Sequence, residues 1–450
     1  MKKLFAIALT LFCFKLFAQF DYKLVSNANS IILTNATIID GKGNKPLPNQ
    51  IIIIENGKIK DIFKMGTKPL PKNGNKIDLT NFYIIPGLID AHYHFLTSVY
   101  SPARQDSLLT YAFVGGITAF RDMSGDAIAL NQLSKKNIDK NIPKPRIYYA
   151  ALFAGKSWFA NDKRASLIMH QLPTGTAPWA KSISDTTNIG YAVQQAKEYG
   201  ATGIKLYADL DAEKIKEITA EAHKQGLKVW SHATVFPAKP SDAIKANVDG
   251  LSHSIEFTWE LDENIPVAFD KRPNEYYKTI DWDKFHFDDN KIIVLLDSMK
   301  TKGIMLDATS SHAHTRYVLR QLAQPEDKRA IKFPLKIDEW VDGFTNLAYR
   351  KGVKILAGTD YQENPEKFDY PNIHSEMEYL VKNCGLSEID AIRSATFNVA
   401  NILNISNNYG SVEIGKIADI IILKKDPTKD IENTKSILYV IKEGVIFQRK

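Results

Sequence analysis

Eight short apolar runs alternate with helix-like stretches along the middle of the chain, and this alternation constrains the fold more than any other feature. The runs are rich in β-branched residues. They read YIIPGLIDAH, GITAFRDM, PRIYYAALFA, GIKLYAD, LKVWSHA, VDGLSHS, GIMLDAT and VKILAGTD. Eight strands with interposed helices are typical of a parallel (β/α)8 barrel, the TIM barrel of the α/β class. A doubly wound open sheet is the alternative, but it would have fewer strands and a glycine-rich phosphate loop, which the sequence lacks.

The clearest helix between two runs is DAEKIKEITAEAHKQG, which starts at Asp211. Asp211 is a suitable N-cap, and Gly226 is a suitable stop. Between them, Ile215, Ile218 and Ala222 fall on one face. The sequence therefore predicts an amphipathic helix that packs against the barrel.

The two ends of the chain differ from the middle, since both consist of short strand-like segments separated by turns. Residues 19–83 include Asn56-Gly57, a hairpin signal, and residues 408–450 include a turn at Glu443-Gly444. We expect one small β-sandwich-like domain assembled from both ends, around a barrel that spans residues 84–407.

Three segments between runs are longer than the rest and rich in aromatic residues or histidine. They cover residues 155–188, 255–289 and 310–337. Loops that follow barrel strands build the active-site face. We therefore expect these segments to form walls over the C-terminal mouth of the barrel, with Trp158, Phe159 and Trp179 either lining an apolar pocket or packing within the loop.

The first 18 residues, MKKLFAIALTLFCFKLFA, have a basic start, an apolar stretch and a small residue at the end. This pattern predicts a signal peptide cleaved after Ala18, and hence a periplasmic or secreted protein. A retained anchor is the alternative. The residues before Cys13 are not those of a lipoprotein site. Beyond the leader the chain holds one cysteine, Cys384, so no intrachain disulfide is expected.

The amino-acid composition limits the classes of molecule that the protein is expected to bind. A chain of 450 residues with 44% hydrophobic and 24% charged residues is typical of a soluble globular protein. The formal charge is +7, part of it in the leader, and no basic run is interleaved with aromatics. We therefore expect a small-molecule substrate, no nucleic acid, and no membrane association once the leader is removed. The sequence leaves homo-oligomer formation open.

Candidate metal ligands stand at the C-terminal ends of several runs, where barrel active sites are built. His92 and His94 are two residues apart, so on a strand both point to the same side. A lone His-x-His pair would more simply be core or loop histidines. The ends of other runs supply Lys205, His232, His253 and Asp360. Taken alone, Lys205 would be a salt-bridged structural lysine and Asp360 a turn residue, but the combination indicates a metal centre.

The segments PGLIDAHYH, GIKLY, SHA, SH and GTD, in this order, resemble the amidohydrolase superfamily, and GLSEIDAIRSATFNVANILNI with GSVEIGKIADIIIL strengthens the resemblance. Within that superfamily the chain is most similar to the imidazolonepropionase-like branch, which includes metal-dependent dipeptidases and prolidase-like carboxypeptidases.

The resemblance implies two divalent metal ions. One would be bound by His92, His94 and Asp360 and the other by His232 and His253, with Lys205 bridging them as a carbamate. It also implies hydrolysis by a metal-bridging hydroxide, with Asp360 taking up the proton of the attacking water and delivering it to the leaving amine. Histidine and carboxylate ligands without thiolates suit zinc best, while manganese, cobalt or iron stay open.

Substrate contacts are predicted from position near the mouth. Tyr207 lies two residues beyond Lys205, so its hydroxyl can face the cavity and bind a carbonyl or oxyanion, or it can pack in the barrel. His312, His314 and Arg316 follow the seventh run and are candidate substrate contacts.

Other polar residues receive structural interpretations. Arg121 and Asp122 are expected to pair at the barrel rim. His374 and Glu376 are expected near the mouth or at a helix cap. No ligand role is expected for His170, His223 and His286.

The sequence thus predicts a secreted metal-dependent amidohydrolase that cleaves an amide or peptide-like C–N bond of a small substrate, a dipeptide or N-acyl amino acid. A cyclic amide or lactone hydrolase on the same fold, with one metal ion, is the first alternative. The second is a non-catalytic ligand-binding barrel.

Overall fold

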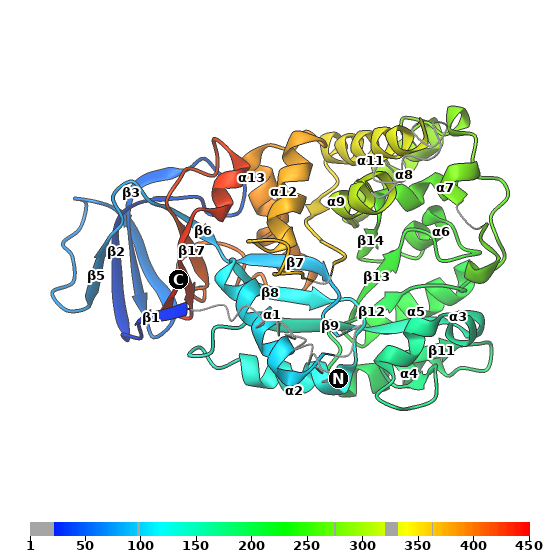
Figure 1. Cartoon of the computed structure of the whole chain (residues 1–450), viewed down its shortest axis with the longest axis horizontal. Helices are drawn as coiled ribbons and strands as arrows, with labels where there is room; N and C mark the ends of the chain where they lie inside the picture. The colour runs from blue at the N-terminus through cyan, green and yellow to red at the C-terminus, as the bar shows by residue number, and fades with distance from the viewer. Residues whose placement is uncertain (1–21, 97–99, 274–275, 320–331, 362) are drawn as a thin grey trace, which may run out of the picture.

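The computed structural model describes residues 22–96, 100–273, 276–319, 332–361 and 363–450. The predicted leader, residues 1–18, lies outside this part of the chain. A barrel with surrounding helices occupies one side of the molecule, and a sheet built from the two ends of the chain occupies the other (Figure 1). No helix in the described ranges is long and apolar enough to cross a membrane.

All eight predicted runs contain a parallel strand of the barrel, so the predicted fold class is confirmed. The strands are β7 (Leu88–Tyr93), β8 (Ile117–Asp122), β9 (Arg146–Gly155), β12 (Gly203–Leu206), β13 (Lys228–His232), β14 (Gly250–Ser252), β15 (Met305–Asp307) and β16 (Ile355–Leu356). They pair in this order. The amide of Ala91 donates to the carbonyl of Ala357 at 3.0 Å, which joins the first strand to the segment after the last.

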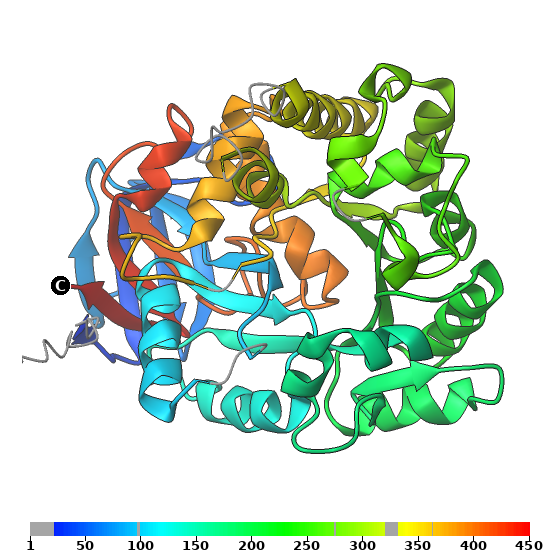
Figure 2. The same cartoon turned by 45° about the vertical axis from the view of Figure 1, so that its right-hand side comes forward.

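The helices lie around the outside of the strands (Figure 2). The longer ones are α1 (Pro102–Val114), α2 (Ala127–Asn137), α4 (Ile189–Glu198), α5 (Ala212–Lys224), α8 (Asn290–Lys302), α11 (Lys332–Lys351) and α12 (Asn372–Lys382). Shorter helices are α3 (Lys156–Asn161), α6 (Pro240–Lys245), α7 (Tyr276–Thr279), α9 (Ser310–Ala313), α13 (Glu388–Ser394) and α14 (Phe397–Ile402).

Helix α5 is the helix predicted from its pattern. The side chain of Asp211 accepts a hydrogen bond from the amide of Lys214, and the residues of the apolar face, Ile215, Ile218 and Ala222, are buried. Gly226 follows the helix with φ +79°, a conformation that glycine adopts without strain.

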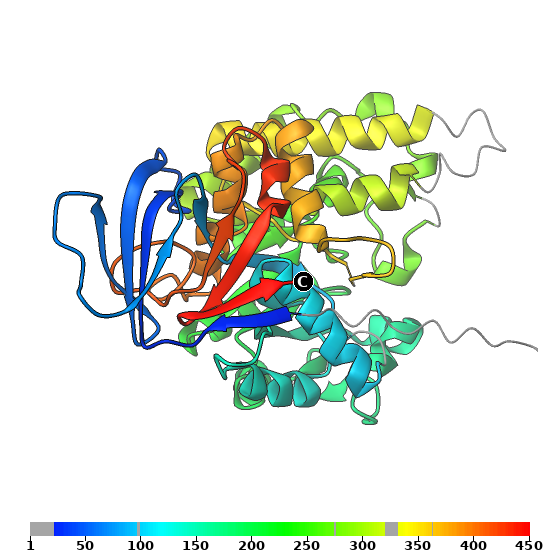
Figure 3. The same ribbon diagram turned by 60° about the vertical axis from the view of Figure 1, so that its left-hand side comes forward.

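The terminal sheet contains strands from both ends of the chain in the order β1-β19-β18-β17-β6-β2-β3-β4, with β5 beside β2 (Figure 3). The strands are β1 (Tyr22–Ser26), β2 (Ser30–Ile38), β3 (Leu47–Glu55), β4 (Lys58–Lys64), β5 (Asn75–Asp78), β6 (Tyr83–Pro86), β17 (Ile420–Leu423), β18 (Ile437–Lys442) and β19 (Val445–Arg449). Its own apolar core is rich in isoleucine. Two small antiparallel strands, β10 (Thr176–Ala177) and β11 (Ala180–Ile183), extend the barrel sheet instead.

The first apolar run divides between the two sheets. β6 pairs with β17 and β2, whereas β7 opens the barrel, and Gly87 separates them. A Cβ at Gly87 would lie 2.2 Å from the Thr118 hydroxyl oxygen, so only glycine fits this crossing between the sheets.

One buried lysine ties the terminal sheet to the barrel. The Lys442 ammonium, at the end of β18, donates to the backbone carbonyls of Asn137, Asp139, Ile142 and Lys144 at 2.5, 3.1, 3.2 and 3.0 Å. The first of these carbonyls belongs to the last residue of α2 and the others follow the helix, so the ammonium satisfies acceptors at a helix C-terminus.

Candidate metal centre and cavity

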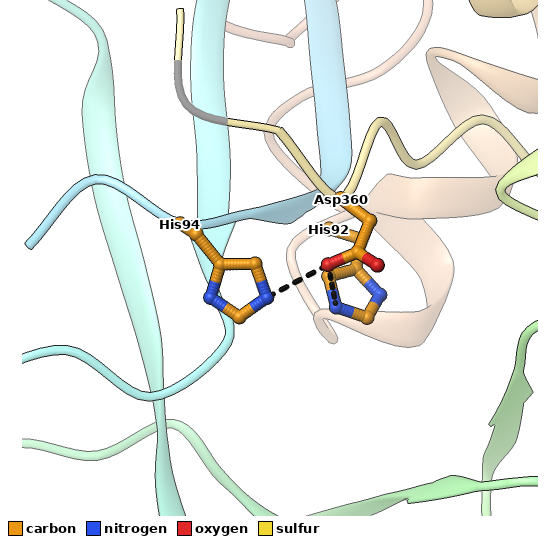
Figure 4. Close-up of side chains that lie close together, drawn as sticks. All are labelled: His92, His94 and Asp360. Atoms are coloured by element: carbon orange, nitrogen blue, oxygen red, sulfur yellow. Dashed lines mark ion pairs between the residues drawn. The ribbon is translucent and has the colours of Figure 1, made fainter. Parts of the chain in front are cut away.

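Three predicted ligands meet at the junction between the first and last barrel strands. The Nε2 atoms of His92 and His94 lie 3.3 and 2.9 Å from the same carboxylate oxygen of Asp360 (Figure 4). Backbone pairing supports this arrangement, since the amide of Asp360 donates to the carbonyl of His92 at 2.7 Å. One ligand atom of each residue lies within 4.8 Å of the ligand atoms of the other two, a spacing that allows all three to bind one metal ion.

The other predicted ligands lie at the ends of the next strands. The Nε2 atoms of His232 and His253 face each other at 3.2 Å. Lys205 lies on β12 with its ammonium 3.1 Å from the Ser252 hydroxyl, and only 1% of its surface is exposed. Two imidazole nitrogens directed at one point, beside a buried lysine, suit a second cation.

The backbone at three strand ends is strained. His253, Thr309 and Asp360 have φ of +76°, +47° and +53°. Such values cost a non-glycine residue roughly 1–3 kcal/mol and cluster at functional sites. Here they turn the side chains of His253 and Asp360 toward the centre of the barrel mouth.

Asp307, which the sequence reasoning missed, organises the layer beneath the ligands. It lies on β15, and its carboxylate accepts from the Nδ1 of His92 at 2.7 Å and from the Ser252 hydroxyl at 3.0 Å. Hydrogen bonding at Nδ1 leaves the Nε2 of His92 with its lone pair toward the metal site. A signal was present in the sequence, since Asp307 is the one charged residue in the run GIMLDAT.

The predicted pair between Arg121 and Asp122 is wrong. Neighbours on a strand point to opposite sides, so the two side chains have different surroundings. Arg121 faces the barrel interior, where its guanidinium stacks 4.2 Å from the Trp230 ring and lies 3.5 Å from Asp307. Asp122 instead accepts backbone N–H groups, including that of Phe95 at 2.7 Å.

Burial and neighbouring charges determine the ionisation of these groups. Burial raises the pKa of Asp307, but His92 and Arg121 outweigh it and hold the pKa well below its usual range. Burial lowers the pKa of Lys205 to about 8, with Asp307 opposing and Arg121 reinforcing the shift. Lys205 is therefore partly neutral near neutral pH, while Asp307 is a permanent anion.

A cavity of about 610 Å³ opens above these residues. Its wall includes all six predicted ligands, and each of the three long segments contributes to it. The contributions of the long segments are Trp158, Arg164 and Ile168, then Ile255, Glu256, Phe269 and Arg272, then His312, Ala313 and Arg316. Phe159 and Trp179 are buried within their segment and are not among the lining residues.

The predicted substrate contacts occupy different positions. Tyr207 lines the cavity and accepts a hydrogen bond from Arg164 at 3.1 Å. The Nε2 of His312 lies 3.6 Å from Asp360, and Arg316 lines the same cavity. His314 points elsewhere, with its Nδ1 3.0 Å from Asp338 of α11.

Glu256 is a second residue that sequence reasoning missed. It is buried in the cavity wall with one carboxylate oxygen 3.3 Å from the Nδ1 of His232. Burial raises the pKa of this carboxyl group. It follows directly on a predicted ligand strand, but neither spacing nor pattern distinguishes it from other loop glutamates.

Other polar residues have structural roles. Glu376 accepts from the amides of Ser310 and Ser311 at 3.0 and 2.8 Å, so it caps α9, which carries His312. His374 is buried between Thr434 and the carbonyl of Gly115. His170 and His223 pair with Asp126 and Asp249.

Histidine and carboxylate groups in this arrangement suit divalent metal ions, because neutral imidazole nitrogens and carboxylate oxygens can direct their lone pairs at a cation. The fold and this cluster define a (β/α)8 barrel protein with a histidine and carboxylate metal site at the C-terminal ends of its strands.

The chain belongs to the Amidohydrolase family, whose sequence profile matches residues 83–447. It is 23% identical over 432 residues to the imidazolonepropionase of Picrophilus torridus, covering 93% of this chain and 94% of that protein. The solved structure of a Xaa-Pro dipeptidase with methionine bound in its active site superposes with a TM-score of 0.70 and 24% identity, covering 93% of this chain and 100% of that chain. The structure of a putative prolidase from Bifidobacterium longum gives a TM-score of 0.69 at 22% identity over 93% and 94%.

These findings confirm the predicted superfamily and its imidazolonepropionase-like branch. The protein is accordingly a metal-dependent hydrolase that acts on carbon–nitrogen bonds of a small molecule.

Proposed function

We propose that the protein is an exported hydrolase that cleaves the amide or peptide-like bond of a dipeptide or an N-acyl amino acid. The observation that carries the proposal is the convergence of His92, His94 and Asp360 at the floor of a cavity of about 610 Å³. Such a cavity has room for two amino-acid residues. Similarity to solved dipeptidase and prolidase structures supports the choice.

The chain would hold two ions, one at His92, His94 and Asp360 and one at His232 and His253. Zinc fits this ligand set best. When bound, the ions supply Lewis acidity and lower the pKa of a water molecule. In this proposal Lys205 would bridge the two groups as a carbamate, which would form when its partly neutral amine adds to carbon dioxide and releases a proton.

Asp360 performs the proton transfer in this proposal. Its side chain is partly buried at the cavity floor. Desolvation raises the pKa of this carboxyl group, but the neighbouring His92 and His312 outweigh that effect and hold the pKa well below its usual range, so the group is ionised. As a carboxylate it can take the proton of the attacking water and pass it to the leaving nitrogen.

Tyr207 orients the substrate carbonyl. Arg164 is only a donor, so the hydrogen bond at 3.1 Å uses a lone pair of the Tyr207 hydroxyl. Burial raises the pKa of Tyr207 and keeps this hydroxyl protonated. Its hydrogen is therefore available to a carbonyl or to the oxyanion that develops from it.

The test is a screen of metal-reconstituted protein against dipeptides and N-acyl amino acids, with Asp360→Asn as the inactive control. Turnover that the variant lacks supports the proposal. Metal-loaded protein that is inert toward these compounds, and toward amide, ester and lactone panels, would instead indicate a ligand-binding barrel.

Opening of a cyclic amide or lactone is the second candidate. This candidate uses the same cavity and needs only the group of His92, His94 and Asp360, whose ligand atoms have the spacing for a single metal ion. Counting metal ions per chain distinguishes the candidates, since the first requires two ions with a carboxylated Lys205.

Export by the segment 1–18 and cleavage after Ala18 are tested by cell fractionation and N-terminal sequencing of the mature protein.

A further inference from the structure

A second cavity of about 530 Å³ adjoins the first on the outer side of the barrel mouth. The two cavities share four lining residues, namely Trp158, Phe269, Arg272 and Arg316. They therefore form one two-part site, with an inner part at the predicted ligands and an outer part beyond them. The combined space exceeds what a dipeptide fills.

The outer cavity is lined by aromatic rings and by cations. Two carboxylates, those of Asp162 and Asp270, also line this cavity, and both already bind other side chains. Asp162 accepts from Arg164 and from the indole N–H of Trp158 at 3.1 Å. Asp270 lies 3.1 Å from the ammonium of Lys271.

Arg272 stands between the two cavities and differs from these paired groups. Its guanidinium stacks 4.2 Å from the Phe269 ring. Within the part of the chain that the structure describes, no carboxylate lies within ion-pair distance of it. A guanidinium stacked on a ring keeps its N–H edge available to grip a carboxylate with two hydrogen bonds.

The platform under Arg272 is fixed to the barrel. Asp209, which follows β12, accepts from the amide of Phe269 at 2.6 Å and from the Ser157 hydroxyl. The carboxylate of Asp209 thus fixes the two segments that carry Phe269 and Trp158, since Ser157 directly precedes Trp158. Because Asp209 lies just after β12, it also fixes the position of Arg272, three residues beyond Phe269, relative to the inner cavity.

We propose that the outer cavity is a subsite for a carboxylate on the distal part of the substrate, gripped by Arg272 over the Trp158 and Phe269 rings. This subsite proposal rests on the proposed amide hydrolysis. It narrows the substrate class to N-acyl amino acids whose acyl group carries a carboxylate in addition to that of the amino acid.

Matched substrates test the subsite. An N-(4-carboxybenzoyl) amino acid and the N-benzoyl derivative of the same amino acid differ only in the distal carboxylate. We expect kcat/KM about tenfold higher for the carboxylated compound, as a charge-assisted pair supplies. In Arg272→Met, which keeps an apolar chain over Phe269, that preference disappears. Arg350→Met, which removes an exposed cation at the end of α11, retains it.

Binding provides a readout that does not need turnover. Calorimetry on the metal-loaded protein compares 4-carbamoylbenzoate with benzamide, and we expect about tenfold tighter binding of the former. Arg272→Met abolishes that difference if the subsite holds the carboxylate, whereas a carboxylate bound at the metal would be unaffected by the variant.

The outcomes separate the two proposals. Equal kcat/KM for the two substrates, or a carboxylate preference that survives in Arg272→Met, overturns the subsite while amide hydrolysis stands. Failure to hydrolyse either substrate, together with an inert screen of dipeptides and N-acyl amino acids, overturns the proposed function, and the calorimetric comparison then decides the subsite by itself. Unchanged melting temperatures of both variants exclude unfolding as the cause.

Discussion

Replacing Asp307 with Asn should weaken metal binding although Asp307 is not itself a predicted ligand. The carboxylate holds the Nδ1 of His92 at 2.7 Å and is a permanent anion, because His92 and Arg121 keep its pKa low in spite of burial. An amide of the same shape is a weaker acceptor and carries no charge. It cannot orient the imidazole or raise its basicity to the same extent.

The magnitude follows from two estimates that agree. Loss of a hydrogen bond to a charged group costs roughly 1.5–3 kcal/mol. Removal of a partner behind a metal-bound histidine typically costs about 10–100-fold in affinity, or about 1.4–2.7 kcal/mol. We therefore expect the Kd for the metal ion bound by His92, His94 and Asp360 to rise by about 10–100-fold.

The assay is a zinc titration against a chromophoric chelator, with Asp297→Asn as the matched control. Asp297 pairs with Lys351 at 2.7 Å on the outside of the barrel, so its replacement should leave the Kd unchanged. A Kd for Asp307→Asn within twofold of the wild type, in protein that melts normally, would refute the role assigned to this carboxylate.

Three further predictions concern catalysis, pH and stability. Asp360→Asn should keep the fold while lowering kcat by about 10²–10⁴-fold, and steady-state kinetics near the wild-type value would contradict its role in proton transfer. The hydrogen bond from His314 to Asp338 raises the histidine pKa above 6.5, so its stabilisation is complete below pH 6.5 and disappears as the pH rises through the folded-state pKa. Urea unfolding of His314→Gln should lack this decline, and an unchanged pH profile would argue against it. Lys442→Met should lower the free energy of unfolding by about 2–4 kcal/mol, because four carbonyls, two of them buried, lose their donor. A loss below about 1 kcal/mol in chemical denaturation would show that water replaces the ammonium.

The alternation of apolar runs was enough to predict the barrel, since each run is buried on both faces and must be a central strand. The same logic located His92, His232 and Asp360, because parallel strands bring their carboxyl ends to one edge. Asp307 also ends its strand, β15, but its role could not be found in this way, since that role depends on which side chains lie across the barrel interior. The error on Arg121 came from treating sequence neighbours as partners, although strand geometry separates them.

The loop contributions to the site were beyond sequence reasoning for a different reason. His312 and His314 looked equivalent in the sequence, but the short helical turns after β15 direct one to Asp360 and the other to Asp338. Glu256 lies in a short 3-10 helix (Ser254–Glu260) and Arg272 directly follows another (Phe269–Lys271), and the sequence of this segment has no clear periodicity, so no pattern predicts where their side chains point. Only tertiary packing places them on the cavity.

The sheet built from both ends of the chain has a consequence for biosynthesis. Strands β1 to β6 are made first, but β17, β18 and β19 reach the ribosome exit only after the whole barrel has been synthesised. Until then the isoleucine-rich face and the open edge of the early strands have no cover, which is the situation in which nascent chains aggregate. We therefore expect late docking of the last strands to limit the maturation of this protein, and a chaperone that shields the early hairpin to increase its yield.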